Sequence, residues 1–351
     1  MAQSLDQFDT RLLTLLQKEV PLTDRPFATI ARELGVGESQ VLDRIARLRS
    51  QPNPVIRQIS GIFDTKSLGY ESTLVAARVA ESELESAVRV INAHPGVTHN
   101  YLRNHAYNLW YTVAVPPDSR LGLERTVDVL HRQSGAIATR MFPTLKLYKI
   151  GVNFDLGGGD EAPRRTSGPG FSHADRARAM QYEVTETDKR MIRVLQQDLP
   201  AIERPFDRWA EQAQVGVDEL LSAARSYLDQ KRMRRFSAVL HHREAGISAN
   251  GMGVWVVPPG QQEQFGATAA TFNAVSHCYL RPTYEDWPYS IFTMVHGATR
   301  ADCEAVFQAI AKATGVVEYA ALYSTVEYKK VRLRYFAGDI EAWEAARMAE
   351  A

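Results

Sequence analysis

The sequence has little cysteine and no surplus of charge of either sign. Only two cysteines occur in 351 residues, Cys278 and Cys303, and neither belongs to a CxxC pair. This usage argues against a disulfide scaffold and a cysteine-based zinc site, and it is typical of a reduced, cytoplasmic protein. Lys plus Arg equals Asp plus Glu at 41 each, so the formal net charge is zero. Because a dedicated nucleic-acid binder usually has a basic surplus, DNA binding is disfavoured.

Long hydrophobic runs are also missing. No uninterrupted apolar stretch approaches the roughly 18 residues of a membrane span. Residues 1–20 form a charged amphipathic pattern rather than a signal peptide. We therefore expect no membrane association. The hydrophobic content of 45% and the charged content of 23% indicate instead a folded globular chain, long enough for two or more domains.

The sequence contains an internal repeat of one unit. Residues 156–178 are rich in Gly, Pro and charge, which is typical of a flexible linker. The flanking halves share short matches in the same order, and we call them the first and second copies. The matches are Arg25-Pro-Phe27 with Arg204-Pro-Phe206, His99, Tyr101, Leu102 and Arg103 with His277, Tyr279, Leu280 and Arg281, and Tyr148-Lys149 with Tyr328-Lys329.

Each copy shows the same order of predicted elements. Three helical patterns and a strand pair, near residues 56–63 in the first copy, follow the order of a winged helix-turn-helix. A β-α-β-β-α-β pattern comes next, which is the ferredoxin-like order. The predicted fold class is therefore α+β, a tandem repeat of winged helix-turn-helix plus ferredoxin-like domain. The predicted boundaries are 1–64 and 65–155 for the first copy, 156–181 for the linker, 182–241 and 242–336 for the second copy, and 337–351 for a C-terminal tail.

This two-domain layout resembles the Lrp/AsnC transcription regulators, which dimerise through the second domain and bind a small molecule there. In a regulator, residues 38–50 would form the recognition helix, with Arg44, Arg47 and Arg49 available to DNA. The same helix also carries acidic residues. Its counterpart at 217–230 offers one arginine beside three acidic residues, so the second copy is a weak DNA reader.

Three longer motifs resemble the siroheme decarboxylases, which share the Lrp/AsnC layout. They are HNYLRNHAYNLWYT, SHCYLRPTYEDWPYSIFTMVHG and RRFSAVLHHREAGISANGMGVW. The resemblance implies a fusion of two related subunits that pair within the chain, and a homodimer of the fused chain stays open. It further implies removal of CO2 from two acetate side chains of siroheme, giving 12,18-didecarboxysiroheme for heme d1 synthesis. No cofactor beyond the substrate's iron is then expected.

Residues 98–110 contain an unusual polar strand face. Because side chains alternate along a strand, His99, Tyr101, Arg103 and His105 are predicted to point the same way. A histidine near its usual pKa of about 6.5 can donate the proton that replaces CO2. The predicted catalytic residues are His99, His105, His242 and His277, with His241 as a further candidate. Axial ligation of the substrate iron, by His242 or His277, is the rival role, and the sequence does not separate the two.

A tetrapyrrole with eight carboxylates needs an apolar slot with cations at its rim, and arginine binds carboxylates through two parallel hydrogen bonds. Trp110 and Trp255 could be either slot walls or core. The predicted substrate-binding residues are Arg57, Tyr101, Arg103, Tyr107, Lys149, Arg234, Arg235, Tyr279, Arg281, Trp287 and Lys329.

The two copies also differ in their motifs. His105 has no clear counterpart in the second copy, and His241 and His242 align with Asp64 and Thr65. We therefore expect two pockets that are chemically unequal, each with side chains from both halves, and only one of them fully competent. A siroheme- or heme-binding sensor without turnover would use the same residues and stays an alternative.

Overall fold

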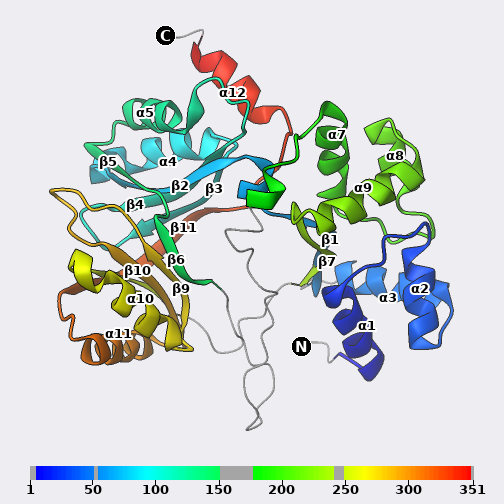
Figure 1. Cartoon of the computed structure of the whole chain (residues 1–351), viewed down its shortest axis with the longest axis horizontal. Helices are drawn as coiled ribbons and strands as arrows, with labels where there is room; N and C mark the ends of the chain where they lie inside the picture. Colours follow the sequence, from blue (N-terminus) through cyan, green and yellow to red (C-terminus); the bar gives the residue numbers. More distant parts are fainter. Residues whose placement is uncertain (1–4, 51–53, 151–176, 241–248, 349–351) are drawn as a thin grey trace.

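Two lobes make up the part of the chain that this computed structural model describes, residues 5–50, 54–150, 177–240 and 249–348 (Figure 1). The helical lobe contains both helix-turn-helix segments, and the sheet lobe contains both ferredoxin-like units. Most of the predicted linker 156–181 lies outside the described residues, as do His241 and His242.

Each copy contributes three helices to the helical lobe. They are α1 (Gln7–Lys18), α2 (Pro26–Leu34) and α3 (Glu38–Ser50), then α7 (Glu186–Leu195), α8 (Asp207–Ala213) and α9 (Val217–Asp229). A capping box starts the first helix of each copy, formed by Asp6 with Asp9 and by Thr185 with Asp188. The buried faces of all six helices belong to one hydrophobic cluster, so the two helix-turn-helix units share a core.

The predicted wing differs from the structure. The expectation was a strand pair within each copy, but β1 (Ile56–Phe63) pairs antiparallel with β7 (Met233–Leu240) of the other copy. Backbone hydrogen bonds extend this exchange, since Val20 N donates to Phe236 O and Leu199 N donates to Ile59 O. Each copy supplies one strand, and a two-stranded ribbon satisfies the backbone groups of both.

The sheet lobe contains one nine-stranded antiparallel sheet, in the order β5-β2-β4-β3-β11-β8-β10-β9-β6. The first four and the next four strands each follow the order of a ferredoxin-like unit, which confirms the predicted fold class. The strands are β2 (Glu71–Arg78), β3 (Val97–Arg103), β4 (Leu109–Val115), β5 (Ala138–Phe142), β6 (Lys146–Ile150), β8 (Ala249–Trp255), β9 (Val275–Leu280), β10 (Ile291–Gly297) and β11 (Tyr319–Lys330).

The last strand of each unit joins the two copies. Residues 319–323 of β11 pair with β8, and its later residues pair with β3 of the first copy. In the same way, β5 pairs with β2, whereas the next strand β6 pairs with β9 of the second copy. The sheet is therefore curled. Side chains from both copies meet between its inner faces, including Trp110, Phe142, Met252 and Phe292.

Helices cover the outer faces of this sheet. They are α4 (Leu84–Ala93) and α5 (Gly122–Ser134) on the first copy, and α10 (Gln262–Thr271) and α11 (Arg300–Thr314) on the second (Figure 1). None of the helices in the described ranges is long and apolar enough to cross a membrane.

The segment expected as a C-terminal tail, 337–351, contains the helix α12 (Asp339–Met348). Trp343 packs edge-on against His94 at 4.4 Å between ring centroids. The buried carboxylate of Glu344 accepts hydrogen bonds from Ser119 and from the backbone N–H of Arg120. The helix α12 therefore packs against the first copy, which supplies both its apolar and its polar contacts.

Candidate active site

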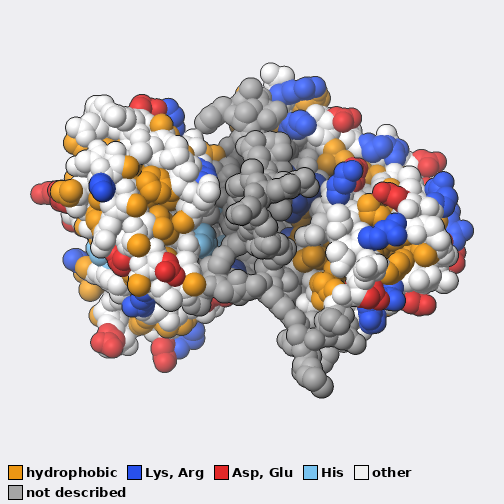
Figure 2. Space-filling model, turned by 90° about the horizontal axis from the view of Figure 1, so that it is seen from below, with side chains coloured by type: hydrophobic (Ala, Val, Ile, Leu, Met, Phe, Trp, Pro, Cys, Tyr) orange, Lys and Arg blue, Asp and Glu red, His pale blue; other side chains and the backbone are white. Residues whose placement is uncertain are grey.

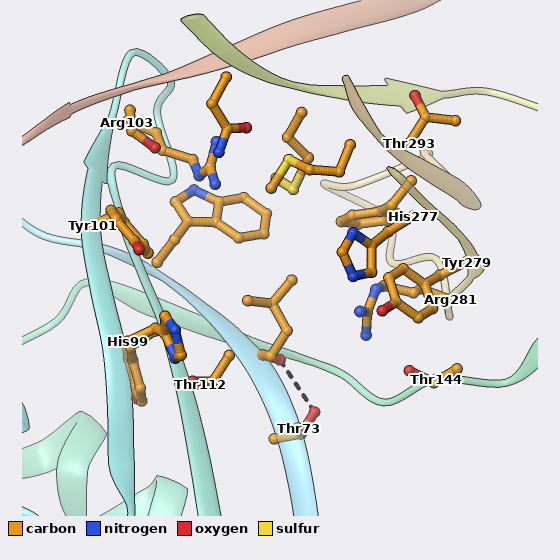
Figure 3. A pocket seen from close by; sticks show the side chains of 18 of the residues that line it. Thr73, His99, Tyr101, Arg103, Thr112, Thr144, His277, Tyr279, Arg281 and Thr293 are labelled. Atoms are coloured by element: carbon orange, nitrogen blue, oxygen red, sulfur yellow. Dashed lines mark hydrogen bonds between the residues drawn. The ribbon is translucent and has the colours of Figure 1, made fainter. Parts of the chain in front are cut away.

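A cavity of about 570 Å³ lies between the inner faces of the curled sheet. Two rows of side chains line opposite walls of it (Figure 3). We call His99, Tyr101 and Arg103 on β3 the first row. The second row consists of His277 and Tyr279 on β9 and of Arg281, which directly follows this strand. Both rows therefore face one cavity in the described part of the chain, instead of the two separate pockets expected from the sequence.

A β-bulge precedes the histidine of each row. In the first copy Val97 pairs with Val113 and His99 with Thr112, which leaves Thr98 without an opposing residue. The bulge turns the Thr98 hydroxyl toward its neighbour, 2.9 Å from His99 Nδ1 and 2.8 Å from Thr112 Oγ1. Bulges commonly re-aim a side chain beside a functional site. Here the bulge fixes one ring nitrogen of His99, whose other nitrogen has no hydrogen-bond partner among the described residues.

The second row repeats this arrangement with one difference. Val275 pairs with Val295 and His277 with Met294, so Ser276 is the bulged residue. Its hydroxyl oxygen lies 2.8 Å from His277 Nδ1 and also 2.8 Å from His296 Nε2. The bulged hydroxyl therefore contacts a second imidazole in the second copy, whereas in the first copy it contacts a threonine hydroxyl.

Burial lowers the pKa of both histidines. For His99 the pKa is lowered by desolvation and then by Lys330. For His277 the pKa is lowered to about 4 by desolvation, with smaller contributions from His296 and Arg281. Both rings are therefore neutral at pH 7, a state in which one nitrogen carries a proton and the other is an acceptor.

The arginines of the two rows are buried cations without a carboxylate partner. Arg103 is 7% exposed and Arg281 is 8% exposed, and neither forms an ion pair within the described residues. Burial lowers the pKa of each to about 10. A buried cation is costly unless it is paired, so this cavity is electrostatically prepared for an anionic ligand.

Each of these arginines is held by the other copy. Arg103 donates to the carbonyl of Leu322 at 3.0 Å, and Arg281 donates to the carbonyl of Phe142. The Nε atom of each lacks a hydrogen-bond partner. Tyr279 stacks under the Arg281 guanidinium at 4.7 Å. Backbone and ring contacts therefore aim both guanidinium groups while leaving a donor on each for a ligand.

The middle of the cavity is apolar. Leu74, Trp110, Met252 and Phe292 line it between the two rows. Trp110 stacks on Phe142 at 5.7 Å, which fixes the indole plane. Trp255, which the sequence left as either slot wall or core, belongs to the helix-facing core of the second copy. A flat apolar ligand with acidic substituents matches this combination of walls.

A basic cleft adjoins the cavity on the side of the helical lobe. The cleft and the cavity share Lys66, Ser72, His99, Thr112 and Tyr279. Cations from both lobes line the cleft, namely Arg57, Arg193, Arg234, Arg332 and Arg334.

The predicted rim residues Arg57 and Arg234 are therefore beside the cavity. Arg234 donates to Asp64 at 2.5 Å. Burial and then Arg234 lower the pKa of Arg235, the third predicted residue of this group. Arg332 was missed by the sequence reasoning. Its pKa is lowered by burial, then by Arg57 and Arg235, which places these cations near one another.

Three predicted site residues lie at the interface between the copies instead of in the cavity. The strand β3 ends at Arg103, so His105 leaves the row and packs against Trp287 at 5.1 Å. Tyr107 donates to Asp286 at 2.6 Å, and Trp287 is fully buried. These contacts join the first copy to the loop of the second.

The two recurring lysines hold helix ends. Lys149 donates to the carbonyl of Phe272 at 2.7 Å, at the end of α10. Lys329 donates to the carbonyls of Asn92 and His94 at the end of α4. Cations at these positions satisfy terminal carbonyls and favour the helix dipole. The structure therefore gives both lysines a scaffold position and does not place them in the cavity wall.

Metal binding by the protein alone finds no support in the described ranges. No group of three or more His, Cys, Asp or Glu side chains there could hold a metal ion. The predicted His242 and the further candidate His241 lie outside the described residues, so their positions are not described.

Fold and site together define a fused pair of Lrp/AsnC-type units with a cavity built for an acidic, partly apolar ligand. Models of known families agree. An AsnC-like ligand-binding domain matches residues 67–149 and 244–329, and a siroheme decarboxylase NirDL-like HTH domain matches residues 9–57 and 188–234.

Individual relatives give the same result. A siroheme decarboxylase of Hydrogenobacter thermophilus is 36% identical over 96% of this chain and 97% of its own. A siroheme decarboxylase beta subunit of Methanosarcina barkeri is 40% identical over 42% of this chain and 98% of its own. The crystal structure of the siroheme decarboxylase NirDL in co-complex with an iron-uroporphyrin III analogue has a TM-score of 0.77 at 32% identity, covering 98% of this chain and 99% of that chain. The chain belongs to the siroheme decarboxylase family.

Proposed function

We infer that this chain is a siroheme decarboxylase of heme d1 synthesis, which removes CO2 from two acetate side chains of siroheme to give 12,18-didecarboxysiroheme. The observation that carries this inference is the pair of buried arginines, Arg103 and Arg281, which face one cavity without a carboxylate partner in the described residues. Siroheme supplies eight carboxylates around a flat apolar ring. Family membership gives the reaction, and the cavity supplies the matching charges.

The residues suit the binding of this substrate. Arg103 and Arg281 bind carboxylates that stay on the product, and Trp110, Met252 and Phe292 contact the ring. Arg57, Arg234 and Arg332 in the adjoining cleft bind further carboxylates at the rim. Burial raises the pKa of Tyr101 to about 12, so its phenol remains a hydrogen-bond donor near a carboxylate oxygen.

The chemistry needs an electron acceptor and a proton. When the bond between the methylene and the carboxylate breaks, CO2 leaves and the electron pair stays on the methylene carbon. The conjugated macrocycle of the substrate delocalises this pair, so we propose that no further cofactor takes part. A proton then converts the methylene to methyl. His99 and His277 face the cavity and are the proposed donors, one for each wall.

We also propose that the reaction takes place in the cytoplasm. Cys278 and Cys303 are both buried and both free. Free thiols in a protein of this size are typical of a reducing compartment.

Anaerobic incubation of the chain with siroheme, followed by mass analysis, tests the function. We expect loss of two CO2 units. His99→Ala and His277→Ala should each slow the reaction by about 100-fold or more, in the range of a lost general acid. If both variants accumulate a singly decarboxylated product, each histidine serves one acetate.

Two outcomes would contradict the assignment. Unchanged siroheme with tight binding would support the sensor alternative, whereas unchanged siroheme without binding would reject the substrate. Full activity in both histidine variants would remove His99 and His277 from the reaction.

A further inference from the structure

The second row contains a continuous chain of hydrogen bonds that the first row lacks. Ser276 Oγ lies 2.8 Å from His277 Nδ1 and 2.8 Å from His296 Nε2. The same hydroxyl can donate to the carbonyl of Met294 at the longer distance of 3.2 Å. The bulge at Ser276 makes this possible, because it brings the hydroxyl to the face that carries His277.

The equivalent position in the first copy cannot continue such a chain. Both Ala114 and His296 lie one residue beyond the bulge partner on their strand. Ala114 N donates to Gly96 O, just as His296 N donates to Ala274 O. Beyond His99, the Thr98 hydroxyl therefore contacts only the hydroxyl of Thr112, and among the described residues no titratable group continues this chain.

We propose that Ser276 and His296 form a proton relay to His277, so that the second copy delivers the proton that replaces CO2 at its own wall of the cavity. This proposal rests on the proposed decarboxylation and adds the route by which the proton reaches His277. Because Ser276 and His296 act through His277, they are positioning residues. The half-buried His296 lines the cavity wall next to the buried Ser276.

The relay balances protons without a change of net charge on His277. Neutral His277 donates the proton on Nε2 to the methylene carbanion, and its Nδ1 accepts the hydroxyl proton of Ser276. The Ser276 oxygen in turn accepts a proton from Nε2 of the His296 imidazolium. One C–C bond breaks and one C–H bond forms, CO2 leaves, and His296 ends neutral.

The electrostatics of the cavity wall favour His277 as the direct proton donor and His296 as the group that resupplies it. Burial, His296 and Arg281 hold the pKa of His277 at about 4, so this ring does not store an extra proton at pH 7. A donor with such a low pKa needs a second group to resupply it, and a relay through a hydroxyl does so without bringing water to the carbanion.

Two substitutions and one control in the full chain test the relay. His296→Ala and His296→Gln both remove the titratable ring, and the glutamine keeps an amide donor if the alanine variant folds poorly. His131→Gln is the matched control, since His131 on α5 pairs with Thr139 at 3.0 Å and does not line the cavity or the cleft. The readouts are the single-turnover rate of CO2 loss from siroheme and the dissociation constant from an absorbance titration.

The relay predicts a rate loss of at least about 100-fold in both His296 variants, at the low end for acid–base catalysis. The dissociation constant should stay within about twofold, because His296 acts through His277 and the arginines are intact. Added imidazole should restore part of the rate of His296→Ala. His131→Gln should keep the wild-type rate within about twofold.

Each contrary result is separable from a failure of the function itself. If wild-type chain does not decarboxylate siroheme, the proposed function is wrong. If wild-type chain is active and His296→Ala and His296→Gln are equally active, the relay is wrong. A slow His296→Ala variant that binds normally but does not respond to imidazole would also reject the relay.

Discussion

At the residue scale, recurrence between the two copies marks symmetry rather than function. Arg103 with Arg281 and Lys149 with Lys329 both recur in the sequence. The arginines are buried in the cavity wall without a carboxylate, whereas the lysines hold the ends of α10 and α4. The burial and the hydrogen-bond partners of the side chains distinguish the arginines, which face the substrate cavity, from the lysines, which stabilise the scaffold.

This difference predicts opposite effects for two substitutions. Arg281→Met should weaken siroheme binding by about 10- to 100-fold, equivalent to roughly 1.5–3 kcal/mol for a hydrogen bond to a charged group. Its free energy of unfolding should stay level or rise, because an unpaired buried cation is removed. An absorbance titration and a urea unfolding curve measure the two quantities.

Lys329→Met is the matched control. It should keep the affinity for siroheme while lowering the free energy of unfolding by about 1 kcal/mol, through loss of the contacts at the end of α4. A loss of siroheme affinity in Lys329→Met, or a loss of stability without a loss of affinity in Arg281→Met, would reverse these assignments.

The sequence predicted the two rows because strand alternation determines which side chains share a face. It extended the first row to His105, since nothing in the sequence marks Arg103 as the end of β3. It missed His296, because the equivalent position in the first copy is Ala114 and the histidine is therefore not repeated. Arg332 was missed for a similar reason, because it follows the last recurring pair, Tyr328-Lys329.

At the element scale, helix α3 is occupied by contacts within the chain. Arg44 pairs with Asp6 and Asp9, and Arg47 pairs with Asp9 at 2.5 Å. Arg49 pairs with Asp198 and donates to the carbonyl of Leu199. The three arginines that a recognition helix would offer to phosphates or bases therefore already have protein partners.

The surface around these helices is mixed in charge. Figure 2 shows Lys and Arg side chains interspersed with Asp and Glu over the helical lobe. We expect no retarded band when the chain, at up to about 1 µM and physiological salt, is mixed with duplex DNA in a gel-shift assay. A sequence-dependent shift at nanomolar concentration would restore the regulator reading.

The strand pairings show why part of the fold could not be predicted. Element type and order within the two copies followed from periodicity, and the structure agrees with them, whereas the helix α12 stands where a tail was expected. The partner of β1 did not, because two similar copies offer similar strands, and periodicity does not say whether a strand pairs within its copy or with the other. The same ambiguity concealed the pairing of β11 with β3.

At the scale of the whole molecule, the two copies exchange strands at several places. The ribbon of β1 with β7, the pairing of β11 with β3 and the return of α12 to the first copy all join the copies.

A chain cut after Arg165 tests this organisation. Residues 1–165 and 166–351 produced together should co-purify in equal amounts and bind siroheme, because the exchanged strands and the shared core hold them. Each piece produced alone should not bind siroheme. Size-exclusion chromatography and an absorbance titration measure both results. Full-affinity binding by one piece alone would show that a single row suffices.

The crossed anchoring of the two arginines has a consequence for how the enzyme comes into being. Arg103 is aimed by a carbonyl of the second copy, and Arg281 by a carbonyl of the first. A nascent chain that has completed only its first copy therefore has no finished guanidinium clamp. We therefore expect the iron tetrapyrrole substrate to bind only after both copies have been synthesised and have folded together.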